Sequence, residues 1–360
     1  MSGNNANRSP IRRQGAEGLL LLTLLSFALS VSLTRLFLEL TGYPQLGGGG
    51  LHIAHVLWGG LLLFVAALIP LILANRWALS LSAILAGVGV GLFIDEVGKF
   101  ITSTNDYFYP TAAPIIYAFF LLTVLVYLNV RKQRLMNPRA EFYTILDGLE
   151  EIIDRDLSKE EREQLITRLD QIIFSGSDAD IVKLAISLKD FLNSSDLSLV
   201  PHRPDFWTRQ LNRYHRFEKR WLSRSRFHRL LIIGSVAVGL WMLTSPVIIL
   251  LFSQTPGELQ NFANAILSNQ LARNQTGLTW LEVRIGLEGS VGILLLLCAF
   301  LLTFRRERIA VTIGTFGLLF SLTVVSLLVF YFDQFSSIIN ATIQFTLLVT
   351  LLRYRNLFVS

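Results

Sequence analysis

The chain has 360 residues, of which 52% are hydrophobic and only 16% are charged. Its mean hydropathy of +0.51 excludes an ordinary soluble globular protein of this length. The formal net charge is +6 at pH 7, but the basic residues are concentrated in particular loops, so this charge alone does not indicate a nucleic-acid partner. The single cysteine, Cys298, lies within an apolar run and cannot form an internal disulfide.

Eight apolar stretches dominate the sequence. They cover residues 19–38, 51–73, 77–94, 112–130, 230–252, 283–303, 309–332 and 336–352. A helix needs about 20 apolar residues to cross the hydrocarbon core, and each stretch comes close to that length. The runs are continuous rather than alternating, which favours helices over membrane strands. We therefore predict an all-α polytopic integral membrane protein with about eight transmembrane helices, four before and four after a central polar block.

Arginine and lysine residues follow every second stretch, and the intervening loops are nearly free of them. The positive-inside rule then places both termini and the central block in the cytoplasm. The first stretch follows a basic start, but it has full length and lacks a small-residue cleavage site, so we expect a retained helix. The predicted organisation is an N-terminal tail (1–18), a first membrane half (19–131), a cytoplasmic helical domain (132–204), a basic amphipathic helix (205–229), a second membrane half (230–352) and a C-terminal tail (353–360).

The central block has the periodicity of three amphipathic helices. Ser158 and Glu161 fit a capping box ahead of the second of them. Three short helices bury little core, so we expect residues 138–192 to form a small cap or to bind a protein partner.

A basic stripe with aromatic residues precedes the fifth stretch. Its predicted lipid-headgroup contacts are Arg209, Arg213, Arg216, Lys219, Arg220 and Trp221. Basic residues mixed with aromatic ones also occur in nucleic-acid interfaces. The adjacent membrane span favours an interfacial helix on anionic headgroups of the bilayer instead, with no nucleic acid as partner.

Ionisable residues gather at the predicted outer face. The candidates for a vestibule, an ion site or a metal site are His52, His55, Asp95, Glu96, Lys99, Asp106, Arg284 and Glu288. His55 lies as far before the turn at Asn75 as Asp95 lies after it, so an antiparallel helix pair places the two at one depth. Helical spacing also pairs Lys99 with the acidic residues before it, Arg284 with Glu288, and Arg35 with Glu39.

Three interpretations of these residues stay open. The charges can be structural, pairing with one another and capping helix ends. They can line an ion or solute pathway, because ionisable residues within spans usually face the protein interior or a water-filled cavity. They can also form a metal-dependent enzyme site, with His52, His55 and Asp95 as ligands of a divalent zinc or iron ion. The sequence contains no His-Glu-x-x-His, Gly-x-Ser-x-Gly or P-loop motif that would identify an enzyme.

Three segments of the first half carry a resemblance. The runs GLFIDEVGKF (91–100), NDYFY (105–109) and LHIAHVLWGG (51–60) resemble motifs in uncharacterised bacterial polytopic membrane proteins. The resemblance implies a multi-pass protein of the bacterial cytoplasmic membrane and supplies no activity, substrate or cofactor. Our functional expectation is a transporter or channel-like protein with a polar vestibule at its outer face. The alternatives are a metal-dependent membrane enzyme and a scaffold that recruits a partner.

The two halves have faint similarities. The third stretch of each half ends in an aromatic-acidic step, at Asp95 and Asp333, and the second stretch of each half carries ionisable residues near its outer end. A parallel duplication is one explanation, and general likeness of membrane helices is the other. Three glycines at alternating positions, Gly87, Gly89 and Gly91, predict close helix approach in the third stretch.

Overall fold

The computed structural model describes residues 10–42, 54–132, 138–153, 155–176, 179–194, 199–200, 224–252 and 275–359. Their regular secondary structure is helical, with one isolated bridge between Ser158 and Val200. The contacts divide the chain into two units, Met1–Leu21 with Tyr127–Arg216 and Leu22–Val126 with Phe217–Ser360. His52 and the basic residues 209–221 lie outside the described residues, so the predictions that rest on them stay predictions.

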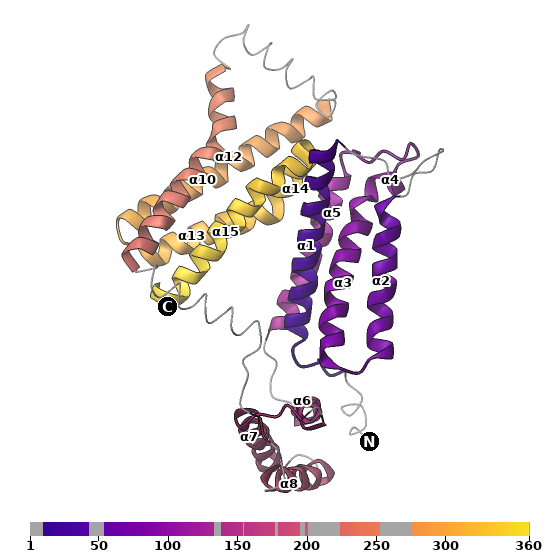
Figure 1. Ribbon diagram of the computed structural model, residues 1–360. Helices are drawn as coiled ribbons and strands as arrows, with labels where there is room; N and C mark the ends of the chain where they lie inside the picture. Colours follow the sequence, from indigo (N-terminus) through magenta and orange to yellow (C-terminus); the bar gives the residue numbers. More distant parts are fainter. Residues whose placement is uncertain are drawn as a thin grey trace, which may run out of the picture. The chain divides into compact units, whose positions relative to one another are not determined.

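The first membrane half consists of α1 (Ala16–Thr41), α2 (His55–Ile72), α3 (Arg76–Asp95) and α5 (Ala112–Arg131). α2 and α3 run side by side, and the short helix α4 (Val97–Ile101) follows α3 directly (Figure 1). α2 and α3 form the predicted hairpin, with Asn75 as the N-cap of α3.

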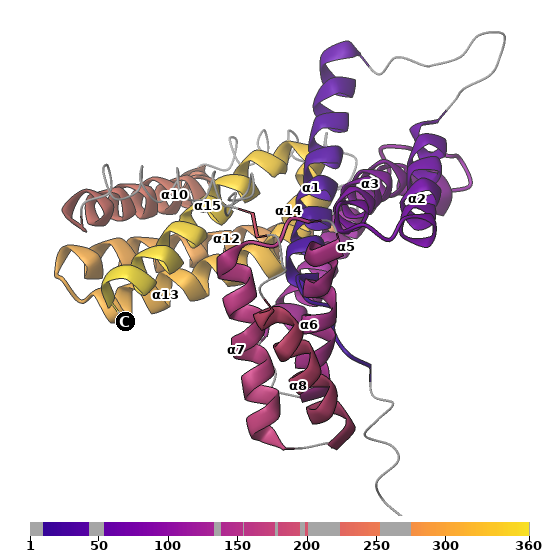
Figure 2. The ribbon, with the colours of Figure 1, turned by 60° about the horizontal axis from the view of Figure 1, so that its bottom comes forward.

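The second membrane half consists of α10 (Arg224–Phe252), α12 (Gln275–Thr303), α13 (Glu307–Phe320), α14 (Ser326–Asp333) and α15 (Ile338–Tyr354). A π-helical turn, η3 (Ser321–Val325), joins α13 to α14, so that the three make one continuous span. The helices lie against one another in both views (Figures 1 and 2). Their shared core includes Leu231, Val291, Leu318 and Leu351, all of which are fully buried.

Seven helical stretches of the described residues are long and apolar enough to cross a membrane. They are Ala16–Thr41, His55–Ile72, Arg76–Asp95, Ala112–Arg131, Arg224–Ile249, Thr279–Thr303 and Glu307–Asp333. Leu25, Leu29 and Leu33 of α1 are exposed at a spacing of four residues, and such an apolar outer surface fits a lipid environment. The helices are therefore those of a membrane protein.

The predicted eighth span corresponds to α15, which has 17 residues. At 1.5 Å per residue this helix is about 26 Å long, less than the roughly 30 Å of a hydrocarbon core. A 3₁₀ turn, η4 (Gln334–Ser337), precedes it, and a π turn, η5 (Arg355–Val359), follows it. The count of eight spans and the four-plus-four arrangement stay predictions.

The predicted close approach at the glycines of α3 is confirmed. A Cβ atom on Gly89 would lie 2.9 Å from the Gly59 carbonyl of α2, and one on Gly91 would lie 2.7 Å from Ser30 of α1. The hydroxyl of Ser30 also donates to the Val88 carbonyl, at 3.1 Å. Glycine thus lets α3 pack backbone to backbone against α2 and α1.

The three helices predicted in the central block are present, as α6 (Pro138–Ile153), α7 (Lys159–Ser175) and α8 (Ala179–Asn193) (Figure 2). Ser158 and Glu161 form the expected capping box at the start of α7. Ile145, Leu169 and Leu192, one from each helix, are fully buried in the small core. Hydrophobic periodicity and one cap were sufficient to predict these three helices.

Candidate functional site

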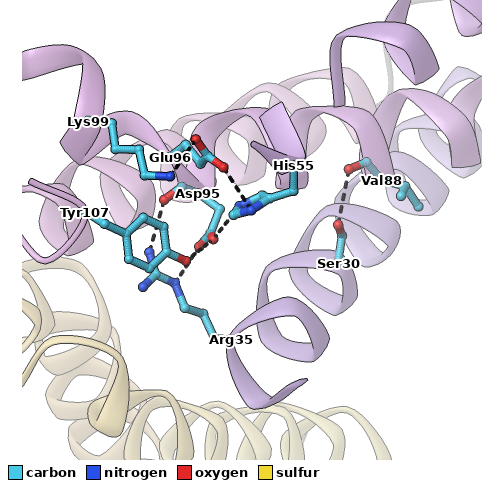
Figure 3. A network of polar contacts seen from close by, with 8 residues as sticks. All are labelled: Ser30, Arg35, His55, Val88, Asp95, Glu96, Lys99 and Tyr107. Carbon is cyan, nitrogen blue, oxygen red and sulfur yellow. Dashed lines mark hydrogen bonds and ion pairs between the residues drawn. The ribbon is translucent and has the colours of Figure 1, made fainter. Parts of the chain in front are cut away.

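The α2–α3 hairpin brings His55 to the carboxylates at the end of α3, as predicted. Nε2 of His55 lies 3.0 Å from Oδ2 of Asp95, and Nδ1 lies 2.9 Å from Oε1 of Glu96. Both ring nitrogens therefore contact a carboxylate (Figure 3). We call the group that surrounds this histidine the His55 cluster, which comprises Arg35, His55, Asp95, Glu96, Lys99 and Tyr107.

Asp95 is the centre of the cluster and is fully buried. Its Oδ1 accepts from Nε of Arg35 at 2.6 Å, and its Oδ2 accepts from the hydroxyl of Tyr107 at 2.6 Å. Arg35 also donates through Nη2 to the backbone carbonyl of Asp95, at 3.0 Å. These contacts tie α1 and the loop after α4 to the end of α3. Sequence reasoning missed both partners, because Arg35 and Tyr107 come from parts of the chain that only the tertiary packing brings together.

Glu96 is the second buried carboxylate, with 1% of its surface exposed. Lys99 of α4 contacts Oε2 of Glu96 at 3.2 Å, which confirms the predicted i, i+3 pair. Burial alone would raise the pKa of the Glu96 carboxyl, but the bonds and charges of His55 and Lys99 outweigh burial and lower that pKa to about 2. Glu96 is therefore ionised at neutral pH.

Tyr107 covers the cluster with its ring. The Arg35 guanidinium lies 4.0 Å from the ring centroid, and the Lys99 ammonium lies 5.3 Å from it, both within the range of cation–π attraction. Burial and the negative charge of Asp95 raise the pKa of the Tyr107 phenol above its usual value. Tyr107 therefore remains an O–H donor to Asp95 and does not add an anion to the two carboxylates of the cluster.

The two ring nitrogens of His55 make unequal contacts with the carboxylates. A neutral imidazole carries one N–H group, so it donates to one carboxylate and presents a lone pair to the other. The contact between Nε2 and Oδ2 of Asp95, at 3.0 Å, has the geometry of a hydrogen bond, whereas Oε1 of Glu96 lies 2.9 Å from Nδ1 without hydrogen-bond geometry. His55 therefore lies between two carboxylates, and together with Arg35 and Lys99 it faces Asp95 and Glu96.

The remaining candidates have other surroundings. Asp106 organises its own loop, because its Oδ1 accepts from the Phe108 amide at 2.9 Å and its amide donates to Thr102. Arg284 and Glu288 form the predicted i, i+4 pair at 3.3 Å in α12, and Arg284 also pairs with Asp333.

A metal site finds little support in this arrangement. Among the described residues, no group of three or more His, Cys, Asp and Glu side chains could hold a metal ion. A metal on either nitrogen of His55 would have to replace a carboxylate contact. Of the predicted ligands, His52 lies outside the described residues, so the geometry of His55 and Asp95 alone favours an ion-pair cluster.

Asp95 and Glu96 are both buried, so they do not line an open vestibule in this conformation. The side chains of His55 and Lys99 are 21% and 24% exposed, respectively. His55 and Lys99 are therefore the partly exposed members of the cluster.

The sequence was compared with protein-family models and with curated proteins, and the structure with solved structures, and none of them matches.

Proposed function

We propose that this membrane protein is a transporter or a channel-like protein in which the His55 cluster takes up and releases one proton. One observation carries the proposal: each ring nitrogen of His55 contacts a different buried carboxylate. An ionisable group at such a position is expensive to bury and commonly marks an ion pathway. Histidine is also the side chain whose charge changes most readily near neutral pH.

Loss of the proton has a structural consequence in this geometry. A neutral His55 keeps one of its two N–H donors, so it holds either Asp95 or Glu96 and repels the other. The contact that it gives up joins the start of α2 to the α3–α4 junction. Deprotonation would thus loosen the end of the hairpin and open the buried carboxylates to a solute or ion, while protonation would close them. The loop charges support an extracytoplasmic position for this end of the spans in a bacterial inner membrane.

The test uses purified full-length protein in vesicles that contain a pH-sensitive dye. A potassium diffusion potential, and then a panel of sugars, amino acids and inorganic ions, is applied to the vesicles. We expect a potential-driven or solute-driven change of internal pH that His55→Gln abolishes. His228→Gln makes the same chemical change in α10 and should leave the response intact. The proposal is wrong if wild-type vesicles never change pH, or if His55→Gln vesicles respond equally.

A second candidate function is partner recruitment by α6–α8. Phe174 of α7 is 95% exposed and Ile153 of α6 is 80% exposed, which is unusual for large apolar side chains of a small domain. We infer that they contact a protein partner. Phe174→Ser should lower the crosslinking yield between this protein and a partner identified in cells. Phe142→Tyr, a conservative change in the buried core, should leave that yield unchanged. Equal crosslinking of the wild type and Phe174→Ser would count against recruitment.

A further inference from the structure

A polar cavity of about 160 Å³ lies in the second membrane half. Residues of α10, α12, η3, α14 and α15 line it, and among the described residues its polar lining includes Arg284, Glu288, Ser321, Asp333 and Gln344. A cavity of this size holds a few water molecules or one small ion with part of its hydration shell, and it is too small for a drug-sized ligand. Polar lining of this kind is costly inside a membrane helix bundle.

The inner wall of the cavity is built on the π-helical turn η3. The amide of Ser326 donates to the carbonyl of Ser321, five residues earlier, and this widened turn brings both serines to the cavity. The Ser321 hydroxyl, 1% exposed, donates to Oε1 of Gln344 at 2.7 Å. The hydroxyl oxygen of Ser321 thus keeps its lone pairs, and both side chains offer oxygen to the cavity. Single π turns inside α-helices are frequent at functional sites.

The charged wall of the cavity carries an excess of negative charge. Arg284 presents both terminal nitrogens to the two carboxylate oxygens of Asp333, with Nη1 to Oδ1 at 2.9 Å. Its contact with Glu288 is a single one, from Nε to Oε1 at 3.3 Å. Among the described residues that line the cavity, one guanidinium therefore stands beside two carboxylates, and its bidentate bond goes to Asp333. Glu288, with 14% of its side chain exposed, holds the charge that is least compensated.

We propose that this cavity binds one monovalent inorganic cation, held by the carboxylate of Glu288 and by the oxygens of Ser321 and Gln344. Hard cations prefer carboxylate, hydroxyl and carbonyl oxygens, which are the groups on offer. The charge of the wall selects the valence: a single positive charge neutralises the two carboxylates and the guanidinium, whereas a divalent ion would leave an excess of positive charge in a poorly solvated site. An anion would meet two carboxylates and is excluded.

This inference goes beyond the proton cycle of the His55 cluster and does not depend on it. A cation can bind in the second half whether or not His55 titrates, and it can bind whether or not the protein transports a solute.

The experiment measures cation binding to the purified full-length protein in detergent. Thermal unfolding is recorded in sodium, potassium and choline chloride at equal ionic strength, and binding of radioactive sodium is measured by equilibrium dialysis at constant pH. We expect sodium, potassium or both to raise the melting temperature above its value in choline, and this rise should saturate with cation concentration. Binding of radioactive sodium should approach one ion per chain. The cation that raises the melting temperature should also displace the bound radioactive sodium.

The variants assign the ion to the cavity. Glu288→Gln should abolish the cation-dependent rise in melting temperature, and Ser321→Ala should weaken the apparent affinity by about tenfold. Glu282→Gln makes the same change as Glu288→Gln in the same helix, at an exposed position, and should bind as the wild type does. If Glu288→Gln does not fold, Ser321→Ala decides.

Three results would overturn the proposal. They are equal melting temperatures in all three salts with no sodium bound, undiminished binding in folded Glu288→Gln or in Ser321→Ala, and a stability that follows pH alone.

Discussion

Asp95→Asn is the sharpest perturbation of the His55 cluster, because it removes one charge while it keeps the shape of the side chain. In the wild type the carboxylate accepts from Arg35 at 2.6 Å, from Tyr107 at 2.6 Å and from His55 at 3.0 Å. An asparagine keeps one acceptor oxygen, but an N–H₂ group replaces the other oxygen. This group is itself a donor, so it cannot accept the hydrogen bond that the lost oxygen accepted. Arg35, 5% exposed, then loses the negative charge of Asp95 while it remains buried.

The size of the effect follows from the burial of the pair. Breaking a buried ion pair by removing one partner costs about 3–5 kcal/mol, mostly because the other charge remains buried. We expect a loss of this size in the free energy of unfolding, measured in mixed micelles by tryptophan fluorescence during titration with sodium dodecyl sulfate. Asp106→Asn, the same substitution in an exposed loop, should change it by less than about 0.5 kcal/mol.

A double variant separates the pair from general damage. Arg35→Gln with Asp95→Asn removes both charges, so the loss should be smaller than the sum of the two single losses by about 0.5–3 kcal/mol. The structural reasoning is refuted if Asp95→Asn matches the wild type within about 0.5 kcal/mol, or if the two single losses simply add.

Three further predictions follow from the fold, the charges and the topology. Gly89→Ala should lower the free energy of unfolding by about 1–3 kcal/mol, because the added Cβ meets the backbone of α2. Gly60→Ala adds a Cβ in open space and should not lower it, and equal losses of stability in the two variants would contradict the packing. The contacts with His55 and Lys99 lower the pKa of Glu96 from 4.5 to about 2. The stability that ionised Glu96 contributes to the folded protein is therefore complete above pH 4.5 and is lost as the pH falls toward 2. Glu96→Gln should remove this part of the acid unfolding curve, and an unchanged curve would exclude it. A cysteine at Gly48 should react with an impermeant thiol reagent in intact cells and one at Ser177 should not; the reverse labelling would invert the topology.

The meeting of His55 with Asp95 could be predicted because it depends on a single hairpin. Both residues lie equally far along antiparallel helices from the turn at Asn75, and the rise per residue of a helix is constant. The Glu96–Lys99 and Arg284–Glu288 contacts depend on the spacing of residues within one segment, so they could be predicted from the sequence as well. The capping box at Ser158 and the glycine contacts of α3 belong to the same local level.

The partner of Arg35 could not be predicted in this way. Spacing along α1 favoured Glu39, but the structure places Arg35 on Asp95, and Glu39 is exposed. The decisive fact is tertiary: α3 approaches α1 closely at Gly91 and Ser30, and this approach carries Asp95 toward Arg35. The glycines indicated that a helix would come close without indicating which one. Tyr107 was missed for a similar reason, because the direction of a loop is set by what it packs against.

The two membrane halves use one arrangement with different chemistry. In each half a residue of the second span pairs with the aspartate that ends the third span, as His55 with Asp95 and as Arg284 with Asp333. The partner in the first half is an imidazole, which exists in a neutral and in a protonated form. The partner in the second half is a guanidinium, which keeps its charge. The proposed proton exchange therefore concerns the first pair, and the proposed cation binding concerns the carboxylates that surround the second pair.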